Sequence, residues 1–218
     1  MFDYMEEEKF RITKEQIENL MELGNIGSGN AITALSQLIN KKIEVSLTSA
    51  EVIPIWKLSE KLGGADTEVF GINSSVKGET ILNILQIFTK KSIFKLVDIL
   101  SEQQHKKKFD EIKFIEDFDE YTLSLIIEIG NILTGHYTSA LANLLSTKYI
   151  PDVPFLAFDR LGAIINEILA SCSEKLDFIL IINTNLKIED LDFFGLFCFI
   201  PSVETLDNIF EKINLAIN

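Results

Sequence analysis

Two copies of a short motif carry the side chains best suited to chemistry. In each copy a glutamate is followed three residues later by an asparagine, as Glu22 and Asn25 and again as Glu128 and Asn131. Residues three apart share one face of an α-helix, so each pair would present a carboxylate beside an amide. A side-chain amide can position a water molecule for in-line attack on phosphorus, as glutamine does in GTPases. The motif therefore predicts either a hydrolytic site or a polar docking point.

A glycine stands seven residues after each glutamate, as Gly29 in the first copy and Gly135 in the second. Both glycines would lie on the helical face that carries the polar pair. Glycine inside a helix costs roughly 1 kcal/mol relative to alanine, so something must compensate for it. Packing of the helix within the chain is one explanation, and close approach of a partner is the other. Because glycine and polar pair recur together, we expect partner docking at Gly29 and Gly135.

Other kinds of active site find little support. The glycine-rich stretch 24–29 lies within a helical pattern, whereas phosphate-binding loops follow a strand and open a helix. His105 and His136 are the only histidines, and no cluster of His, Cys or Asp has the spacing of metal ligands. We therefore expect no metal or other cofactor of the chain's own. Cys172 and Cys198 lie in apolar surroundings, which favours reduced structural thiols over a reactive or bridged pair.

The composition is that of a globular protein. Hydrophobic residues make up 47% and charged residues 24% of the 218 residues. The net charge of −13 disfavours binding to nucleic acid or to anionic membrane surfaces. The acidic N-terminus does not resemble a signal peptide, and the apolar runs are too short to span a bilayer. We expect a soluble, cytoplasmic protein without membrane insertion, whose partners are small molecules or other proteins.

The two motifs belong to an internal repeat with a constant offset of 106 residues, from Glu22 to Glu128. Residues 22–42 match residues 128–148 at glycine and polar positions as well as at apolar ones, which shared amphipathicity does not explain. A capping-box pattern at Thr13 predicts a long helix from there to about Asn40. Asp119 is the predicted N-cap of the matching helix, which ends near Ser146.

The order of elements is predicted to be α-β-α-β-β-α, twice. In the first half the elements after the long helix are expected at 43–52, 54–62, 68–76, 80–88 and 89–102, and in the second at 149–153, 159–172, 177–185, 192–200 and 202–217. The fold class is therefore α/β (α+β), with one domain over 1–218 made of repeats at about 10–102 and 111–217 and a linker at about 103–110. We expect pseudo-two-fold symmetry, with a mixed six-stranded sheet and the two long helices on the outside.

The duplicated motif resembles the CheC / CheX / FliY family of CheY-phosphate phosphatases, and CheC most of all. The family pattern is Asp or Ser, three residues, Glu, two residues, Asn, twenty-two residues, then Pro. The second copy matches throughout, with Ser124 and Pro154 at the outer positions. The first copy has Glu18 and Thr48 there instead. Within the family, CheX-like proteins carry a single motif and the FliY type adds a C-terminal switch domain.

The resemblance implies a hydrolase that acts on the phosphoaspartate of a CheY-type response regulator in bacterial chemotaxis. Asn25 and Asn131 would orient the attacking water, while Glu22 and Glu128 would pair with the regulator's active-site lysine. Magnesium would be bound by the regulator, and no covalent enzyme intermediate is expected. The receptor deamidase CheD would be a second partner. We expect the chain to be a monomer. The alternative is a non-catalytic adaptor that binds a receiver domain or CheD. Asparagine in both copies favours catalysis, because docking alone would tolerate aspartate or serine.

Overall fold

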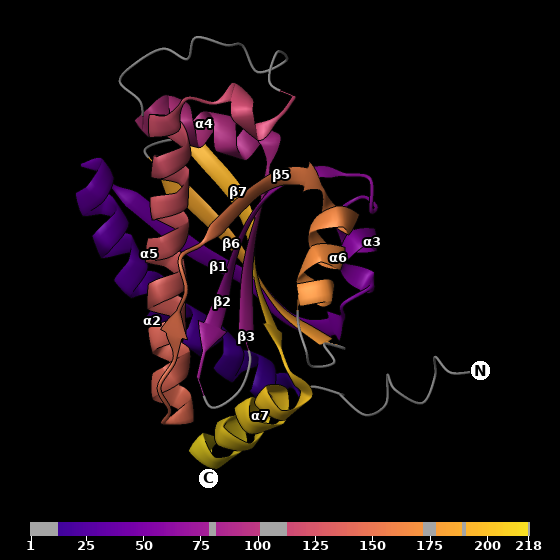
Figure 1. Cartoon of the computed structure of the whole chain (residues 1–218). Coiled ribbons are helices and arrows are strands. Elements are labelled where there is room, and N and C mark those ends of the chain that lie inside the picture. Colours follow the sequence, from indigo (N-terminus) through magenta and orange to yellow (C-terminus); the bar gives the residue numbers. More distant parts are fainter. Residues whose placement is uncertain (1–12, 79–81, 101–112, 172–177, 189–190, 218) are drawn as a thin grey trace.

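The structure, a computed structural model, describes residues 13–78, 82–100, 113–171, 178–188 and 191–217. A seven-stranded sheet forms its centre, with α2 and α5 on one face and α3 and α6 on the other (Figure 1). This confirms the predicted α/β class. The helices are α2 Lys14–Ile39, α3 Lys57–Lys61, α4 Lys90–Leu100, α5 Glu120–Leu145, α6 Leu161–Ser171 and α7 Val203–Ile217, and a 3-10 turn covers Ile115–Asp117. The strands are β1 Ile43–Pro54, β2 Glu68–Lys77, β3 Leu82–Thr89, β4 Ile150–Pro151, β5 Phe155–Arg160, β6 Phe178–Ile188 and β7 Leu191–Pro201.

The two long helices have matching lengths and ends. Each has 26 residues. The side chain of Thr13 accepts a hydrogen bond from the backbone of Gln16 at the start of α2, and Asp119 caps α5 in the same way. The helices end at Asn40 and Ser146, which both adopt the left-handed conformation with φ of 50° and 51°. The capping pattern thus predicts both helices correctly, and the offset of the repeat holds at all four ends.

The strand order is symmetric with respect to the repeat. Across the sheet the strands run β1, β6, β7, β3, β2 and β4, and β5 also pairs with β2. The first strand of each half pairs with the hairpin of the other half, and the hairpins meet where β3 pairs with β7. If each strand is replaced by its equivalent in the other half, the same strand order results, read in the opposite direction. Since α2 and α5 share a face, an approximate two-fold axis passes through the sheet between β3 and β7.

The predicted mixed, six-stranded sheet is wrong in two respects. Every pairing among the described strands is antiparallel. The two-fold axis makes β3 and β7 run in opposite directions, and β2–β3 and β6–β7 are hairpins of consecutive strands. The predicted strand at 149–153 reduces to Ile150–Pro151, and a separate strand β5 follows. The expected limits of the two repeats and of the linker fall partly outside the described residues, so the domain limits stay predictions.

Apolar side chains fill both faces of the sheet. One buried cluster joins the sheet to α2 and α5, and a second joins it to α3 and α6. Because the inner sides of α2 and α5 are occupied in this way, their outer sides are left for polar residues. Among the described residues, no helix combines the length and the apolar character that crossing a bilayer would require.

Candidate functional site

The four side chains of the duplicated motif are exposed. Glu22 and Asn25 lie on the outer face of α2, and Glu128 and Asn131 on that of α5. Within the described part of the chain none of the four makes a side-chain hydrogen bond or ion pair. The structure places each glutamate beside its asparagine, and it places the two pairs on separate helices. Each pair is therefore available to a partner as a site of its own.

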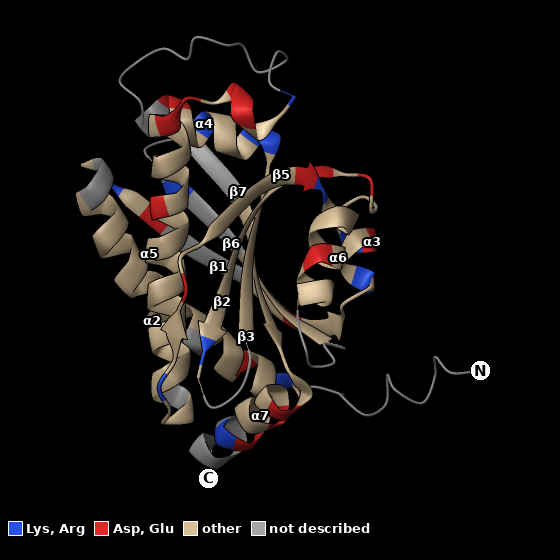
Figure 2. Cartoon of the chain, in the orientation of Figure 1, with Lys and Arg blue, Asp and Glu red and all other residues tan. Residues whose placement is uncertain are grey.

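Neither glutamate has a basic neighbour within one turn of its helix, although the acidic Glu18 lies one turn before Glu22. Glu22 is the one charged residue in the stretch 19–39, and Glu128 the one in 121–145. Charged residues are more frequent on elements such as α4 and α7, while α2 and α5 carry few of them in the view of Figure 2. With no basic neighbour on its helix over these stretches, each carboxylate is poised to bind a cation supplied by a partner.

Four glycines of the two helices divide into two kinds. A Cβ atom on Gly27 would lie 2.9 Å from Cδ1 of Tyr137, and one on Gly130 would lie 2.6 Å from Cγ2 of Ile72. A Cβ atom on Gly29 or on Gly135 would meet nothing within 4 Å. Packing within the chain therefore explains Gly27 and Gly130, and it does not explain Gly29 and Gly135.

The crossing of α2 and α5 uses a small residue against a large one. The ring of Tyr137 stacks on Phe197 with the ring centroids 4.0 Å apart, and its backbone lies against Gly27. In the repeat the equivalents of Gly27 and Tyr137 are Leu133 and Ala31, which are both buried. In both pairs the larger residue, Tyr137 or Leu133, belongs to α5 and the smaller residue belongs to α2. The two-fold symmetry of the helix crossing is therefore approximate.

A buried glutamine of the sheet contacts α5 beside the second motif. Nε2 of Gln86 donates hydrogen bonds to the carbonyl oxygen of Gly130, at 2.8 Å, and to Oγ1 of Thr134, at 2.9 Å. Gly130 stands between Glu128 and Asn131 in the chain. Gln86 is not among the predicted site residues, although its place inside the largely apolar stretch 81–88 was an available signal.

The outer positions of the family pattern lie at equivalent places in the two halves. Ser124 and Glu18 are both exposed, one helical turn before the glutamates. Pro154 is buried and separates β4 from β5, which pair with β2 in registers that differ by one residue. Thr48 falls where the register of β1 against β6 shifts between Leu47 and Ser49. The first copy thus keeps the strand irregularity without the proline.

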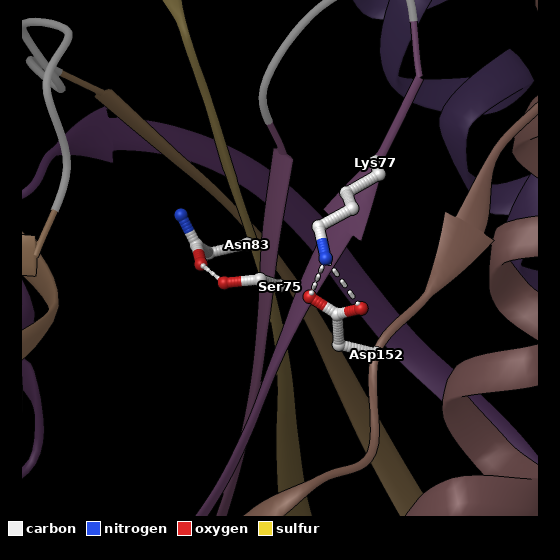
Figure 3. A network of polar contacts seen from close by, with 4 residues as sticks. All are labelled: Ser75, Lys77, Asn83 and Asp152. Carbon is white, nitrogen blue, oxygen red and sulfur yellow. Dashed lines mark hydrogen bonds and ion pairs between the residues drawn. The ribbon is translucent and has the colours of Figure 1, made fainter.

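Polar contacts hold the segment before Pro154 against β2 (Figure 3). Nζ of Lys77 lies 2.9 Å from Oδ1 and 2.8 Å from Oδ2 of Asp152, and the backbone N–H of Asp152 donates to the carbonyl oxygen of Ser75 at 2.8 Å. The hydroxyl of Ser75 donates to Oδ1 of Asn83 at 3.0 Å. The ion pair is exposed and adds at most about 1 kcal/mol to stability, so its part here is to fix the path of the chain.

Comparison with known proteins places the motif in a family. The CheC-like family matches residues 20–46 and 122–156, which contain both Glu/Asn pairs. The CheY-P phosphatase CheC of Bacillus subtilis (strain 168) is 32% identical over 177 residues, which cover 80% of this chain and 81% of that protein. This relationship is one of sequence over most of both chains.

Solved structures share the fold at lower identity. FliY of Thermotoga maritima matches with a TM-score of 0.72 and 17% identity, over 94% of this chain and 98% of that one. The FliM middle domain of H. pylori gives 0.62 and 12%, over 92% and 99%. A chain of the CheX-CheY-BeF3-Mg+2 complex of Borrelia burgdorferi gives 0.51 and 12%, over 82% and 96%. At such identities these likenesses show the fold alone, while the sequence relationship shows that the chain belongs to the CheC-like family.

Proposed function

We propose that the chain is a phosphatase that hydrolyses the aspartyl phosphate of a CheY-type response regulator in bacterial chemotaxis. The observation that carries the proposal is that both Glu/Asn pairs are exposed and make no side-chain polar contact within the described chain. The family relative named as a CheY-P phosphatase supports the same reaction. The sites are Glu22 with Asn25 on α2 and Glu128 with Asn131 on α5.

The asparagine is the catalytic residue of each site. Its side-chain oxygen accepts a hydrogen bond from a water molecule, and its NH2 group can donate one, so the amide holds the water in line with the phosphorus–oxygen bond. The water oxygen then bonds to phosphorus while the bond from phosphorus to the aspartyl oxygen breaks. The products are the aspartate carboxylate and inorganic phosphate, which takes up the protons of the water. Asn25 and Asn131 thus supply positioning, the main requirement in phosphoryl transfer.

The glutamate holds the helix over the acyl phosphate. Because Glu22 and Glu128 have no ion-pair partner within the described chain, each can accept a charge-assisted hydrogen bond from a lysine of the regulator. Any magnesium at the acyl phosphate would be bound by the regulator and would neutralise charge there. We propose no metal bound by this chain.

The open glycines set how closely the partner approaches. Gly29 and Gly135 keep the outer helical surface flat beside each Asn, and no residue of the described chain fills the space above them. A loop of the regulator could therefore contact the helix backbone there. Such a contact would explain why glycine stands at these two positions despite its helical cost, because packing within the chain does not explain it.

A non-catalytic adaptor for a receiver domain or for CheD is the competing function. The two are separated by measuring phosphate loss from an autophosphorylated receiver domain, with and without the chain, beside a binding measurement on the same sample. We expect the chain to accelerate the loss of phosphate catalytically, at a chain concentration well below that of the receiver. Binding without acceleration would support the adaptor. We further propose that the chain acts as a cytoplasmic monomer, which leaves both sites open, and that CheD is a second partner.

A further inference from the structure

We propose that Gln86 is a positioning residue for the second site, where it fixes α5 at the peptide between Glu128 and Asn131. This inference rests on the proposed function. Gln86 does not reach the reacting atoms, because it lies on the sheet side of α5 while Glu128 and Asn131 lie on the solvent side. It acts through the helix backbone.

Two hydrogen bonds hold the side-chain NH2 group of Gln86 in place. The side chain is fully buried in β3, and the two hydrogens of its amide are both used, one on the carbonyl oxygen of Gly130 and one on Oγ1 of Thr134. The hydroxyl of Thr134 lies 3.4 Å from that of Ser74 on β2. The motif segment of α5 is therefore tied to two strands by directional contacts, in addition to apolar packing.

Among the described residues, the first site has no such tie. Ser28 is the repeat equivalent of Thr134, and its hydroxyl donates to the carbonyl oxygen of Asn25, 3.1 Å away in the same helix. The strand residue that corresponds to Gln86 follows from the strand pairings, which match between the two halves when the offset of 106 residues is carried from β1 to β4 and β5. These pairings place Phe197, an apolar residue and the direct partner of Gln86 on β7, at the equivalent position.

Stability alone does not account for a glutamine here. Oε1 of Gln86 is buried and has no hydrogen-bond partner among the described residues. A buried polar atom left unsatisfied costs about 1–3 kcal/mol, which offsets the roughly 1–3 kcal/mol that the two hydrogen bonds of Nε2 contribute. The tie to Gly130 and Thr134 instead restricts the rotation and the sliding of α5, which would move the amide of Asn131. A misplacement of about 1 Å at a reacting group can cost about 100-fold in rate.

The test compares the two sites in one protein. Gln86→Met keeps the length of the side chain and removes the hydrogen bonds, and Thr134→Val is a second variant that removes the hydroxyl with little change of shape. Each is placed in an Asn25→Ala background, where only the second site can act, and in an Asn131→Ala background, where only the first can. Measurements are kcat and KM for a phosphorylated receiver domain, together with the free energy of unfolding.

In the Asn25→Ala background we expect kcat to fall by about 10-fold or more, because the water-positioning amide is misplaced. KM should stay within about 2-fold, since the residue acts on orientation and not on ground-state binding. In the Asn131→Ala background the same substitutions should leave kcat within about 2-fold of its parent, because the first site has no such tie. Only a positioning role predicts loss at one site and not at the other.

Equal losses in both backgrounds would reduce Gln86 to a general structural residue and overturn the proposal. Unchanged kcat in both backgrounds, or a rise in KM alone, would also overturn it. The background substitutions Asn25→Ala and Asn131→Ala, without a change at Gln86 or Thr134, test the proposed function separately. If the chain with both Asn25→Ala and Asn131→Ala is as active as the unmodified chain, the catalytic sites are wrong and the role of Gln86 falls with them.

Discussion

Gly27 of α2 lies directly against Tyr137 of α5, so that a Cβ atom on the glycine would stand 3.2 Å from the Cα atom of the tyrosine. Two residues later along α2, Gly29 has open space where its Cβ atom would be. The same helix thus carries one glycine that the fold requires and one that it does not. The second kind, Gly29 together with Gly135, is where the fold and the proposed function can be separated by experiment.

Alanine at Gly29 and at Gly135 should stabilise the protein and weaken its action. Each substitution should raise the free energy of unfolding by up to about 1 kcal/mol, the difference in helix propensity. It should also slow dephosphorylation, because the new methyl group keeps the partner away from the helix backbone. Denaturant unfolding and receiver-phosphate decay on the same variants measure the two effects.

Gly27→Ala is the matched control for these variants. There the added methyl group would meet the ring and the backbone of Tyr137, so this alanine should destabilise the protein, by about 1–3 kcal/mol for an overpacked site. Stabilised Gly29→Ala and Gly135→Ala variants that retain full activity would show that the open glycines are not docking positions.

The thiol of Cys198 should be unreactive in the folded protein. Cys198 is fully buried and free, and burial raises the pKa of its thiol because the thiolate loses its hydration. At pH 8 the reactive thiolate is therefore scarcer than in the unfolded chain. In a Cys172→Ser variant, a thiol reagent should label the chain only after denaturant is added. Labelling of the native protein at the unfolded rate would contradict the burial of this strand. Cys172 itself lies outside the described residues.

The isolated protein should bind no divalent metal ion stoichiometrically. In the described part of the chain, His, Cys, Asp and Glu do not gather in groups of three or more that could hold one. Elemental analysis of protein washed with chelator is the measurement. About one zinc, manganese or magnesium ion retained per chain would be incompatible with a reaction in which the regulator brings the metal.

The long helices could be predicted closely because their ends are encoded locally. The capping pairs at Thr13 and Asp119 and the repeat itself specify α2 and α5, and the period of the apolar residues specifies which side faces the sheet. Asn25 and Asn131 lie on the opposite side of their helices, so their exposure could be predicted as well.

The sheet was less predictable because its pairings are not local. Strand direction at the centre of the sheet depends on how the two halves pack together, and no turn motif in the sequence determines that packing. Pro154 lies between two short strands, and β5 forms directly after it because Phe155–Arg160 can pair with the edge of β2. Sequence alone assigned the end of this segment to a helix. Likewise Gln86 gains meaning only from the helix that packs on it, and Gly27 differs from Gly29 only through Tyr137.

The most direct measurement is the decay of phosphate on a receiver domain with the unmodified chain, with Asn25→Ala, with Asn131→Ala and with both changes. Because the asparagines are exposed, each alanine should alter stability by no more than about 0.5 kcal/mol. Each single variant should retain the activity of the other site, with the larger loss for Asn131→Ala, whose motif is complete.

The double variant decides the matter. It should lose activity by orders of magnitude while still binding the phosphorylated receiver through Glu22 and Glu128, since the amides act on the transition state and the carboxylates on binding. If the double variant hydrolyses the phosphate at close to the unmodified rate, the two helix faces are docking surfaces and the catalytic role of the asparagines is wrong.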